Sequence, residues 1–403
     1  MIGIGIVGLP NVGKSTLFNA ITKTQNAEAA NYPFATIEPN IGMVSVPDSR
    51  LEELAKIINP QRTLGATVEF IDIAGLVKGA SKGEGLGNQF LTNIRNTAAI
   101  CQVVRCFDDP NIVHVEGSVD PIRDIETINA ELIFADLDTV ERAMQKNTKL
   151  ARGGNNEAKT LLTVLEKCKK ELEEFRLLKN FEFSEIEEEL LKTYQLLTKK
   201  PMMFAANVSE EDLAKGTNEY VEIVREFAKQ YDSEVVVFSA KVEAELIEIE
   251  DEEERQEFID ELGITEPSLN RLIRAGFKLL GLITYFTAGE KEVRAWTVRQ
   301  GTNAQNSAGE IHTDIQRGFI RAEVVAYDKF IEKNERIAMI ASKNSSNSRK
   351  NQLLSKIMLA MLEANKKSGD MSVPKKDSKG VHKKYGISAC DYEKRNFYIT
   401  ATL

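Results

Sequence analysis

The chain lacks long hydrophobic runs and has few cysteines. No apolar run reaches the 18 residues of a bilayer-spanning helix, which excludes a membrane span. The four cysteines among 403 residues have neither C-x-x-C spacing nor a matching histidine cluster, which favours reduced thiols in a cytosolic protein. The N-terminus has no basic n-region and its short apolar run leads straight into a glycine-rich loop, so we expect no secretory signal. These absences predict a cytoplasmic protein without a membrane partner.

Length, composition and charge limit the possible number and kind of domains. A chain of this length is expected to hold two or three domains, and its 42% hydrophobic and 28% charged residues are ordinary for a globular protein. The net charge of −9 hides an asymmetry, because residues 331–403 carry +8 and the remainder −17. An acidic body with a basic tail suggests regional attraction to nucleic acid, and the plainer alternative is a solvated surface.

Six apolar, β-branched runs have helical patterns between most of them. Such alternation predicts a doubly wound α/β domain with a mostly parallel sheet. The runs are Ile2–Val7, Ile41–Val46, Thr67–Ile73, Ala98–Phe107, Pro201–Asn207 and Glu234–Ser239.

The alternation breaks between about residues 126 and 200. Leu, Glu and Lys at helical spacing dominate there, with a turn at Gly153–Asn156, so we expect an inserted helical hairpin. Residues 243–261 are strongly acidic and are predicted to form an exposed helix pair. Alternation in Ile283–Phe286, Glu292–Val298 and Ala322–Ala326 suggests a small β-rich domain.

The most informative motif is Gly8–Thr16, which fits G-x-x-x-x-G-K-[ST] without a mismatch and follows the first apolar run. Its glycines let backbone N–H groups close around a phosphate, Lys14 reaches the terminal phosphates, and the Ser15 hydroxyl is a ligand for Mg²⁺. The helix from about Thr16 directs its positive end at the anion. The motif predicts a phosphate-binding loop.

Two further segments have the spacing of a nucleotide switch. Asp72 follows a buried strand 57 residues after Ser15, so it can hold Mg²⁺ through water, and the Gly75 N–H can sense a γ-phosphate. Thr36, in Asn31–Thr36, is the natural switch-I hydroxyl for Mg²⁺. Five glycines between positions 75 and 87 suit a flexible switch II, and a disordered surface loop is the alternative.

The position after Gly75 holds Leu76, where many small GTPases have a water-orienting glutamine. Leucine cannot orient water, so hydrolysis must use another group or a different geometry. His114 is a candidate catalytic residue because histidine titrates in the range that suits acid–base work. A structural histidine is the alternative.

The base-side loop after the fifth run is Asn207-Val208-Ser209-Glu210, where GTPases have N-K-x-D. The lysine is absent and the carboxylate stands one methylene further out, which weakens a guanine clamp. An adenine amino group can instead meet Asn207 or a backbone carbonyl, with Val208 against the base face. Ser239-Ala240-Lys241 supplies a second base-edge loop.

With these residues in view, the chain resembles the YchF/Obg-like ATPase family, a branch of the Obg-related translation-factor GTPases. The resemblance implies a P-loop NTPase G domain (1–125 and 201–280), an inserted coiled-coil-like helical domain (126–200) and a small α+β TGS-like domain (281–330). A divergent basic tail, 331–403, follows. The resemblance also rests on Asp109–His114, Val119–Pro121, Asp124–Leu132, Ala288–Val298, Ile311–Asp314 and Gly318–Val324.

The resemblance implies a preference for ATP over GTP, dependence on Mg²⁺ and association with ribosomes. Ser15 and Thr36 would bind Mg²⁺, and Asn207 with Val208 would contact adenine. Asn11 matches an asparagine that some relatives use to ligate K⁺, which makes K⁺ an open hypothesis here. The phosphate-binding residues carried over are Asn11, Val12, Gly13, Lys14, Ser15 and Thr16.

The end of the chain departs from the family pattern. Family members close the TGS domain with a strand containing an Asp-Gly-Asp-Val-like turn, and no such segment follows Phe330. Lineage divergence or a shifted reading frame near Ile331 would each explain this.

Taken together, these residues predict a slow, Mg²⁺-dependent ATPase switch. Its expected partners are ATP, GTP with lower affinity, the ribosome through its large subunit, and RNA. The alternatives are a GTPase in ribosome assembly and a nucleotide-sensing ribosome or RNA adaptor whose hydrolysis is incidental.

Overall fold

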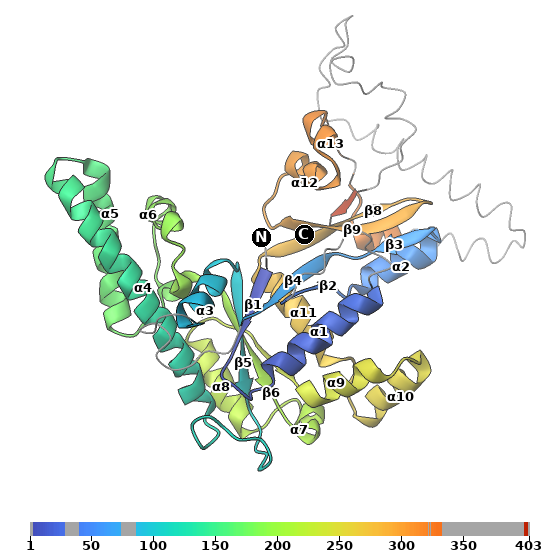
Figure 1. Ribbon diagram of the computed structural model, residues 1–403. Helices are drawn as coiled ribbons and strands as arrows, with labels where there is room; N and C mark the ends of the chain where they lie inside the picture. The colour runs from blue at the N-terminus through green and yellow to red at the C-terminus, as the bar shows by residue number, and fades with distance from the viewer. Residues whose placement is uncertain are drawn as a thin grey trace, which may run out of the picture. The chain divides into compact units, whose positions relative to one another are not determined.

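The computed structural model describes residues 3–28, 40–73, 86–320, 322, 324–332 and 399–401. They fall into two compact units (Figure 1). The first is formed by residues up to 47 together with 67–281, and the second by residues 48–66 together with those from 282 onward.

The first unit contains a six-stranded sheet in the order β2-β4-β1-β5-β6-β7. Only β2 runs antiparallel to its neighbour, so the predicted doubly wound, mostly parallel fold is confirmed. Each strand lies within one of the six predicted runs. Their bounds are β1 (Gly3–Val7), β2 (Ile41–Ser45), β4 (Thr67–Asp72), β5 (Ala99–Arg105), β6 (Met202–Asn207) and β7 (Val235–Phe238).

The central strands are buried because helices cover both faces of the sheet. Every residue of β1, β5 and β6 is buried, which explains why these strands show continuous apolar runs instead of alternation. Helix α1 adds Leu17 and Ile21, both fully buried. The helices outside the hairpin are α1 (Lys14–Glu28), α3 (Leu86–Arg95), α6 (Glu185–Leu191), α7 (Glu210–Lys215), α8 (Glu219–Lys229), α9 (Ala240–Glu248), α10 (Glu252–Glu261) and α11 (Ser268–Leu279).

The predicted helical hairpin is formed by α4 (Pro121–Arg152) and α5 (Asn156–Glu173), which pack against each other (Figure 1). Helix α4 begins at Pro121 instead of near 126, because Asp120 caps it and proline suits the first helical position. The turn at Gly153–Asn156 is confirmed, and Asn155 caps α5 by accepting from the Ala158 N–H.

A buried carboxylate ties the hairpin to the chain that returns to the sheet. Asp136 of α4 is fully buried and accepts from the N–H groups of Leu197 (2.9 Å) and Thr198 (2.8 Å) and from the Thr198 hydroxyl (2.7 Å). Burial raises the pKa of Asp136 from its ordinary value. These bonds fix the short 3₁₀ turn Leu197–Lys199 that precedes β6.

The second unit contains a four-stranded sheet in the order β10-β8-β9-β3. The predicted β-rich region is confirmed in β8 and β9, and of Ala322–Ala326 the described residues show only an isolated bridge at Val324. The sequence did not indicate β10, which pairs antiparallel with β8. The elements are α2 (Ser49–Ile58), β3 (Arg62–Leu64), β8 (Leu282–Ala288), β9 (Glu292–Arg299), α12 (Ala304–Ile311), α13 (Thr313–Arg317) and β10 (Ile399–Ala401).

Residues 48–66 require a correction to the predicted domain boundaries. The sequence placed them within the G domain, whereas in the structure they pack with the C-terminal unit. Strand β3 runs parallel to β9, and the Arg50 guanidinium donates to the Thr284 hydroxyl (3.0 Å) and lies 5.1 Å from the Phe286 ring centroid. Main-chain pairing and a cation–π contact therefore assign this segment to the second unit.

None of the helices within the described ranges is both long and apolar enough to cross a membrane.

Candidate functional site

The predicted phosphate loop lies at the carboxyl end of β1 and leads into α1. The Leu17 N–H donates to the Gly13 carbonyl (3.0 Å), which closes the first helical turn. Asn11 and Gly13 have positive φ angles of 64° and 97°, and a Cβ at residue 13 would lie 2.3 Å from the Asn207 side-chain nitrogen. Glycine is therefore required at position 13. The first turn of α1 has no acidic residue, so its positive end is free to attract an anion.

Lys14 and Asp72 meet in this site. The buried Lys14 ammonium forms an ion pair with the Asp72 carboxylate at the end of β4, because β4 and β1 are neighbours with Ile6 opposite Asp72. Ser15 and Thr16 are exposed in the first turn of α1. A hydroxyl and a carboxylate beside an open helix end are the oxygen ligands that Mg²⁺ prefers, so these residues fit the ion.

Several predicted switch residues lie outside the described residues. They are Thr36 with its segment Asn31–Thr36, Gly75, Leu76 and the glycine-rich segment as far as residue 85. Within the described ranges, no group of three or more His, Cys, Asp and Glu side chains is placed to hold a metal ion. Of the three predicted Mg²⁺ ligands, Ser15 and Asp72 lie within the described residues and Thr36 does not.

Asn207, at the end of β6, joins two loops of the site. Its side-chain Nδ2 donates to the Val12 carbonyl and its Oδ1 accepts from the Ala240 N–H, both at 2.9 Å. The side chain is buried. The sequence assigned Asn207 to base recognition, but these bonds make it a bridge between the phosphate loop and the Ser239–Ala240 turn. Contact with a base stays a prediction.

The two predicted base-side loops lie side by side at the ends of β6 and β7. The Val208 N–H donates to the Phe238 carbonyl (2.9 Å), and the Val208 side chain is only 2% exposed. Glu210 begins α7, and its carboxylate lies 3.1 Å from the Lys241 ammonium of the other loop. The Glu210 carboxylate occupies the position from which GTPases bind guanine, and it is therefore already engaged in an exposed ion pair with Lys241.

His114 is buried and has a partner at each ring nitrogen. Its Nε2 lies 2.8 Å from Asp124 Oδ2, and its Nδ1 accepts from the Glu116 N–H (3.1 Å). These contacts fasten the loop to the start of α4. One residue earlier, the Val113 carbonyl accepts from Asn11 Nδ2 of the phosphate loop (3.1 Å). The loop thus touches the site, and a catalytic role for His114 stays a prediction.

Arg105 is a residue of the site that sequence reasoning missed. Its guanidinium, buried at the end of β5, donates to the carbonyls of Phe107 (3.1 Å), Asp109 (3.2 Å) and Ile112 (3.0 Å). It also lies 4.7 Å from the Phe107 ring centroid. An arginine at the end of a mostly apolar strand was the only sign of it in the sequence. It fixes the loop that carries His114 against the phosphate loop.

Comparison with known proteins identifies the family. Residues 3–136 match the family model described as "50S ribosome-binding GTPase", and residues 282–355 match a C-terminal YchF model described as "Protein of unknown function (DUF933)". The "Ribosome-binding ATPase YchF" of Escherichia coli O157:H7 is 58% identical over 327 residues, covering 81% of this chain and 89% of the relative. The chain belongs to the YchF family.

Other YchF proteins extend the comparison. The "Ribosome-binding ATPase YchF" of Bacillus subtilis (strain 168) is 55% identical over 328 residues, with coverage of 81% and 89%. The structure of the Schizosaccharomyces pombe YchF GTPase superposes with a TM-score of 0.75 at 40% identity, covering 83% of this chain and 90% of that one. With its P-loop in place, this YchF-family chain is a P-loop nucleotide hydrolase.

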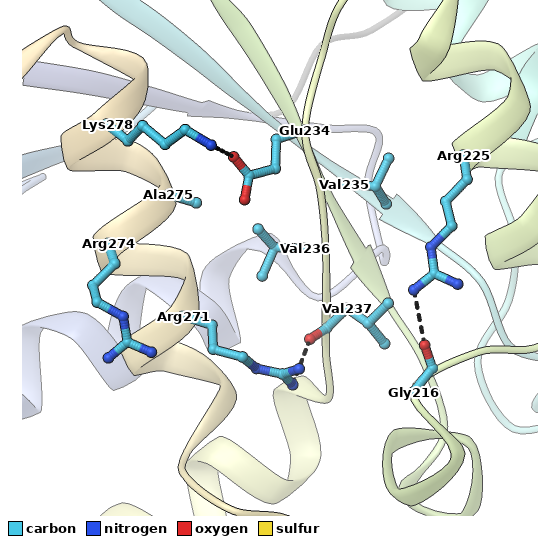
Figure 2. A pocket seen from close by; sticks show the side chains of 10 residues that line it. All are labelled: Gly216, Arg225, Glu234, Val235, Val236, Val237, Arg271, Arg274, Ala275 and Lys278. Atoms are coloured by element: carbon cyan, nitrogen blue, oxygen red, sulfur yellow. Dashed lines mark hydrogen bonds and ion pairs between the residues drawn. The ribbon is translucent and has the colours of Figure 1, made fainter.

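A pocket of about 340 Å³ lies along the edge strand β7 and contains none of the predicted site residues (Figure 2). Arg271 donates to the Val237 carbonyl (3.2 Å), Arg225 donates to the Gly216 carbonyl (3.0 Å), and Lys278 pairs with Glu234 (3.1 Å). These cations already have partners, and Arg271 covers an outward-facing carbonyl of the sheet edge. The arrangement protects an edge strand.

Proposed function

We propose that this chain is a cytoplasmic, Mg²⁺-dependent ATPase that acts as a slow nucleotide switch on the ribosome. The choice of ATP over GTP rests on one observation. The phosphate loop is bridged by Asn207 to a base-side loop that lacks the guanine-binding lysine, and the Glu210 carboxylate there is paired with Lys241. The bacterial relatives are named ribosome-binding ATPases, which supports both the choice of ATP as substrate and the ribosome as partner.

The chemistry of this site would rest mainly on charge stabilisation. Lys14 exchanges the Asp72 carboxylate for the terminal phosphate, and the N–H groups of the phosphate loop surround the transferred group. Ser15 and Asp72, with Thr36, would hold Mg²⁺, which when bound neutralises charge on the phosphate oxygens. The Gly75 N–H would sense the γ-phosphate. Leu76 cannot orient the attacking water, so slow turnover is expected without a partner.

Two finer features belong to the same proposal. His114 would act as general base only after the Glu116 N–H releases its Nδ1, because Nδ1 is the ring nitrogen that accepts and Nε2 faces the Asp124 carboxylate. Asn11 uses its Nδ2 to hold Val113, which leaves its Oδ1 for a K⁺ ion. Replacing K⁺ with Na⁺ tests the second feature, since equal turnover in both would dispose of it.

The test of the nucleotide is calorimetric titration with ATP and with GTP at matched Mg²⁺, repeated with ribosomes present. We expect tighter binding of ATP, with stronger ribosome binding in the ATP state. Tighter binding of GTP would support the competing function, a GTPase in ribosome assembly.

The adaptor hypothesis is tested with Lys14→Ala, which removes the ammonium that holds the terminal phosphate. We expect the variant to lose nucleotide-dependent ribosome binding, with a circular dichroism spectrum like that of the unaltered protein as the control. Ribosome binding that is unchanged in this variant, and indifferent to ATP, would instead make the chain an adaptor whose hydrolysis is incidental.

A further inference from the structure

The end of the α4–α5 hairpin carries an excess of positive charge on an acidic protein. We define the hairpin tip as residues 146–160, the last turns of α4, the connecting turn and the first turn of α5. The tip contains four cationic residues and one acidic residue, a net charge of +3, whereas the whole chain has −9. The cationic residues are Lys146, Lys149, Arg152 and Lys159, and each is exposed.

The four cations of the tip lack a carboxylate partner among the described residues, whereas all but Lys170 of the five cations elsewhere on α4 and α5 have one. None of the four forms an ion pair with any residue that the structure describes, whereas Arg142 pairs with Asp138 (2.5 Å) and Lys169 with Glu141 (2.8 Å). An unpaired cluster produces an outward positive field that paired surface charges do not. The hairpin tip therefore stands out from the surface around it.

Helix electrostatics explain only part of the cluster. Cations in the last turn of a helix interact favourably with its dipole, which accounts for Lys149 and Arg152 in α4. Lys159 is near the positive end of α5, where the dipole disfavours a cation, and Lys146 is a further turn back from the end of α4. Two of the four charges thus need another explanation, and a negatively charged partner supplies it.

The tip is shaped to reach such a partner. Helix α4 has 32 residues, which corresponds to a length of about 48 Å, and Figure 1 shows its far end projecting from the sheet of the same unit. The turn residue Gly154 has φ = 93° and open space around the position of a Cβ. Because glycine has no side chain, the backbone of this narrow turn can approach the surface of a partner closely.

We propose that the hairpin tip binds RNA phosphates on the ribosome. The inference rests on the proposed function, in that the ribosome is taken as the partner. An acidic protein is repelled by RNA over most of its surface, so attraction must come from local positive patches. Lysine and arginine side chains without internal partners can bind phosphates without first breaking an ion pair.

The test replaces three tip lysines, Lys146→Ala/Lys149→Ala/Lys159→Ala, which removes charge at exposed helical positions where alanine favours the helix. The matched control is Lys192→Ala/Lys215→Ala/Lys229→Ala, which makes the same charge change at exposed lysines that have carboxylate partners in the same unit. Binding to ribosomes and to protein-free ribosomal RNA is measured by sedimentation at several KCl concentrations, together with basal ATPase activity.

We expect the tip variant to bind both ribosomes and RNA at least tenfold more weakly at 0.1 M KCl. The slope of log K against log [KCl] should become shallower by about one for each phosphate that the variant no longer binds. The control variant should bind like the unaltered protein, and all three proteins should hydrolyse ATP equally.

Unchanged binding of the tip variant would overturn this proposal and leave the proposed function standing, provided that ATP still controls ribosome binding. Weaker binding to ribosomes but not to protein-free RNA would also overturn it, because the partner of the tip would then be a ribosomal protein. Failure of the unaltered protein to bind ribosomes in any nucleotide state would instead refute the proposed function.

Discussion

At the scale of single residues, the Asn207 side chain links two loops of the nucleotide site. Asn207→Ala removes the bonds to the Val12 carbonyl and the Ala240 N–H, each of which contributes about 1 kcal/mol. Since about 1.4 kcal/mol corresponds to a tenfold change in affinity, we expect the dissociation constant for ATP to rise tenfold or more, as measured by calorimetry. Asn207→Asp keeps the acceptor for Ala240 but sets a carboxylate against the Val12 carbonyl, so it should also weaken binding. Wild-type affinity in Asn207→Ala would show that the bridge is dispensable.

The Arg105 guanidinium holds the loop before His114 through three backbone carbonyls. Arg105→Lys keeps the charge but cannot reach all three acceptors, because an ammonium donates from a single point. We expect a several-fold lower kcat with little change in KM for ATP, and a loss of about 1–2 kcal/mol in the free energy of unfolding in urea. The control is Arg176→Lys, an exposed arginine paired with Glu171, which should change neither quantity. A change in KM alone would contradict a role in positioning this loop.

The site illustrates what single residues reveal in a sequence. The meeting of Lys14 and Asp72 was predictable because phosphate loops and D-x-x-G segments end neighbouring strands. The bridging role of Asn207 was not, because it depends on which atoms its amide meets once β6 and β7 are aligned. The role of Arg105 was not predictable either, since all its acceptors are main-chain carbonyls, which carry no mark in the sequence.

At the scale of elements, Glu243 caps the neighbouring helix α11. Glu243 of α9 is 1% exposed, and its carboxylate accepts from the Ser268 hydroxyl (2.5 Å) and the Leu269 N–H (3.2 Å). The N-cap residue of α11, Pro267, has no side-chain acceptor of its own. Glu243→Ala should lower the free energy of unfolding in urea by about 1–2 kcal/mol. Glu245→Ala is the matched control. The side chain of Glu245, also in α9, is 44% exposed, so its loss should lower the free energy of unfolding by less than about 0.5 kcal/mol. Equal effects would show that the cap contributes nothing.

Helix α9, which carries Glu243, also shows the limit of predicting elements from the sequence. The strands and the hairpin were predictable because buried parallel strands and helical periodicity leave local patterns. Two helices were also predicted over residues 243–261. This acidic helix pair was expected to be exposed, whereas Glu243 is buried and its burial raises the pKa of the carboxyl. Likewise, the sequence did not indicate β3, and its place in the second unit depends on its pairing with the distant β9. Contacts between remote segments decide both cases.

At the scale of the whole molecule, three buried thiols report on unfolding of the first unit. Burial raises the pKa of Cys101, Cys106 and Cys168 to about 12. At pH 8 the thiolate fraction is then about 10⁻⁴, so iodoacetamide should leave these residues unmodified in the native protein and modify them in urea, as mapped by mass spectrometry. Because the folded pKa values exceed that of an exposed thiol, their contribution to stability is present below about pH 9 and is lost as the pH rises toward 12. Rapid native labelling at pH 8 would refute their burial.

Nucleotide binding should protect these thiols by mass action. A ligand that binds only the folded state at 100 times its dissociation constant lowers the unfolded population about 100-fold. Mg²⁺ with a non-hydrolysable ATP analogue should therefore slow the labelling of Cys101, in central strand β5, by about that factor when labelling requires unfolding of the unit. Cys168 should slow equally, because α4 packs against both β5 and α5. Lys14→Ala serves as the control and should show no protection by the analogue. Protection of Cys101 without protection of Cys168 would mean that the hairpin opens independently of the sheet. Protection of neither thiol would mean that the phosphate loop does not bind nucleotide in solution.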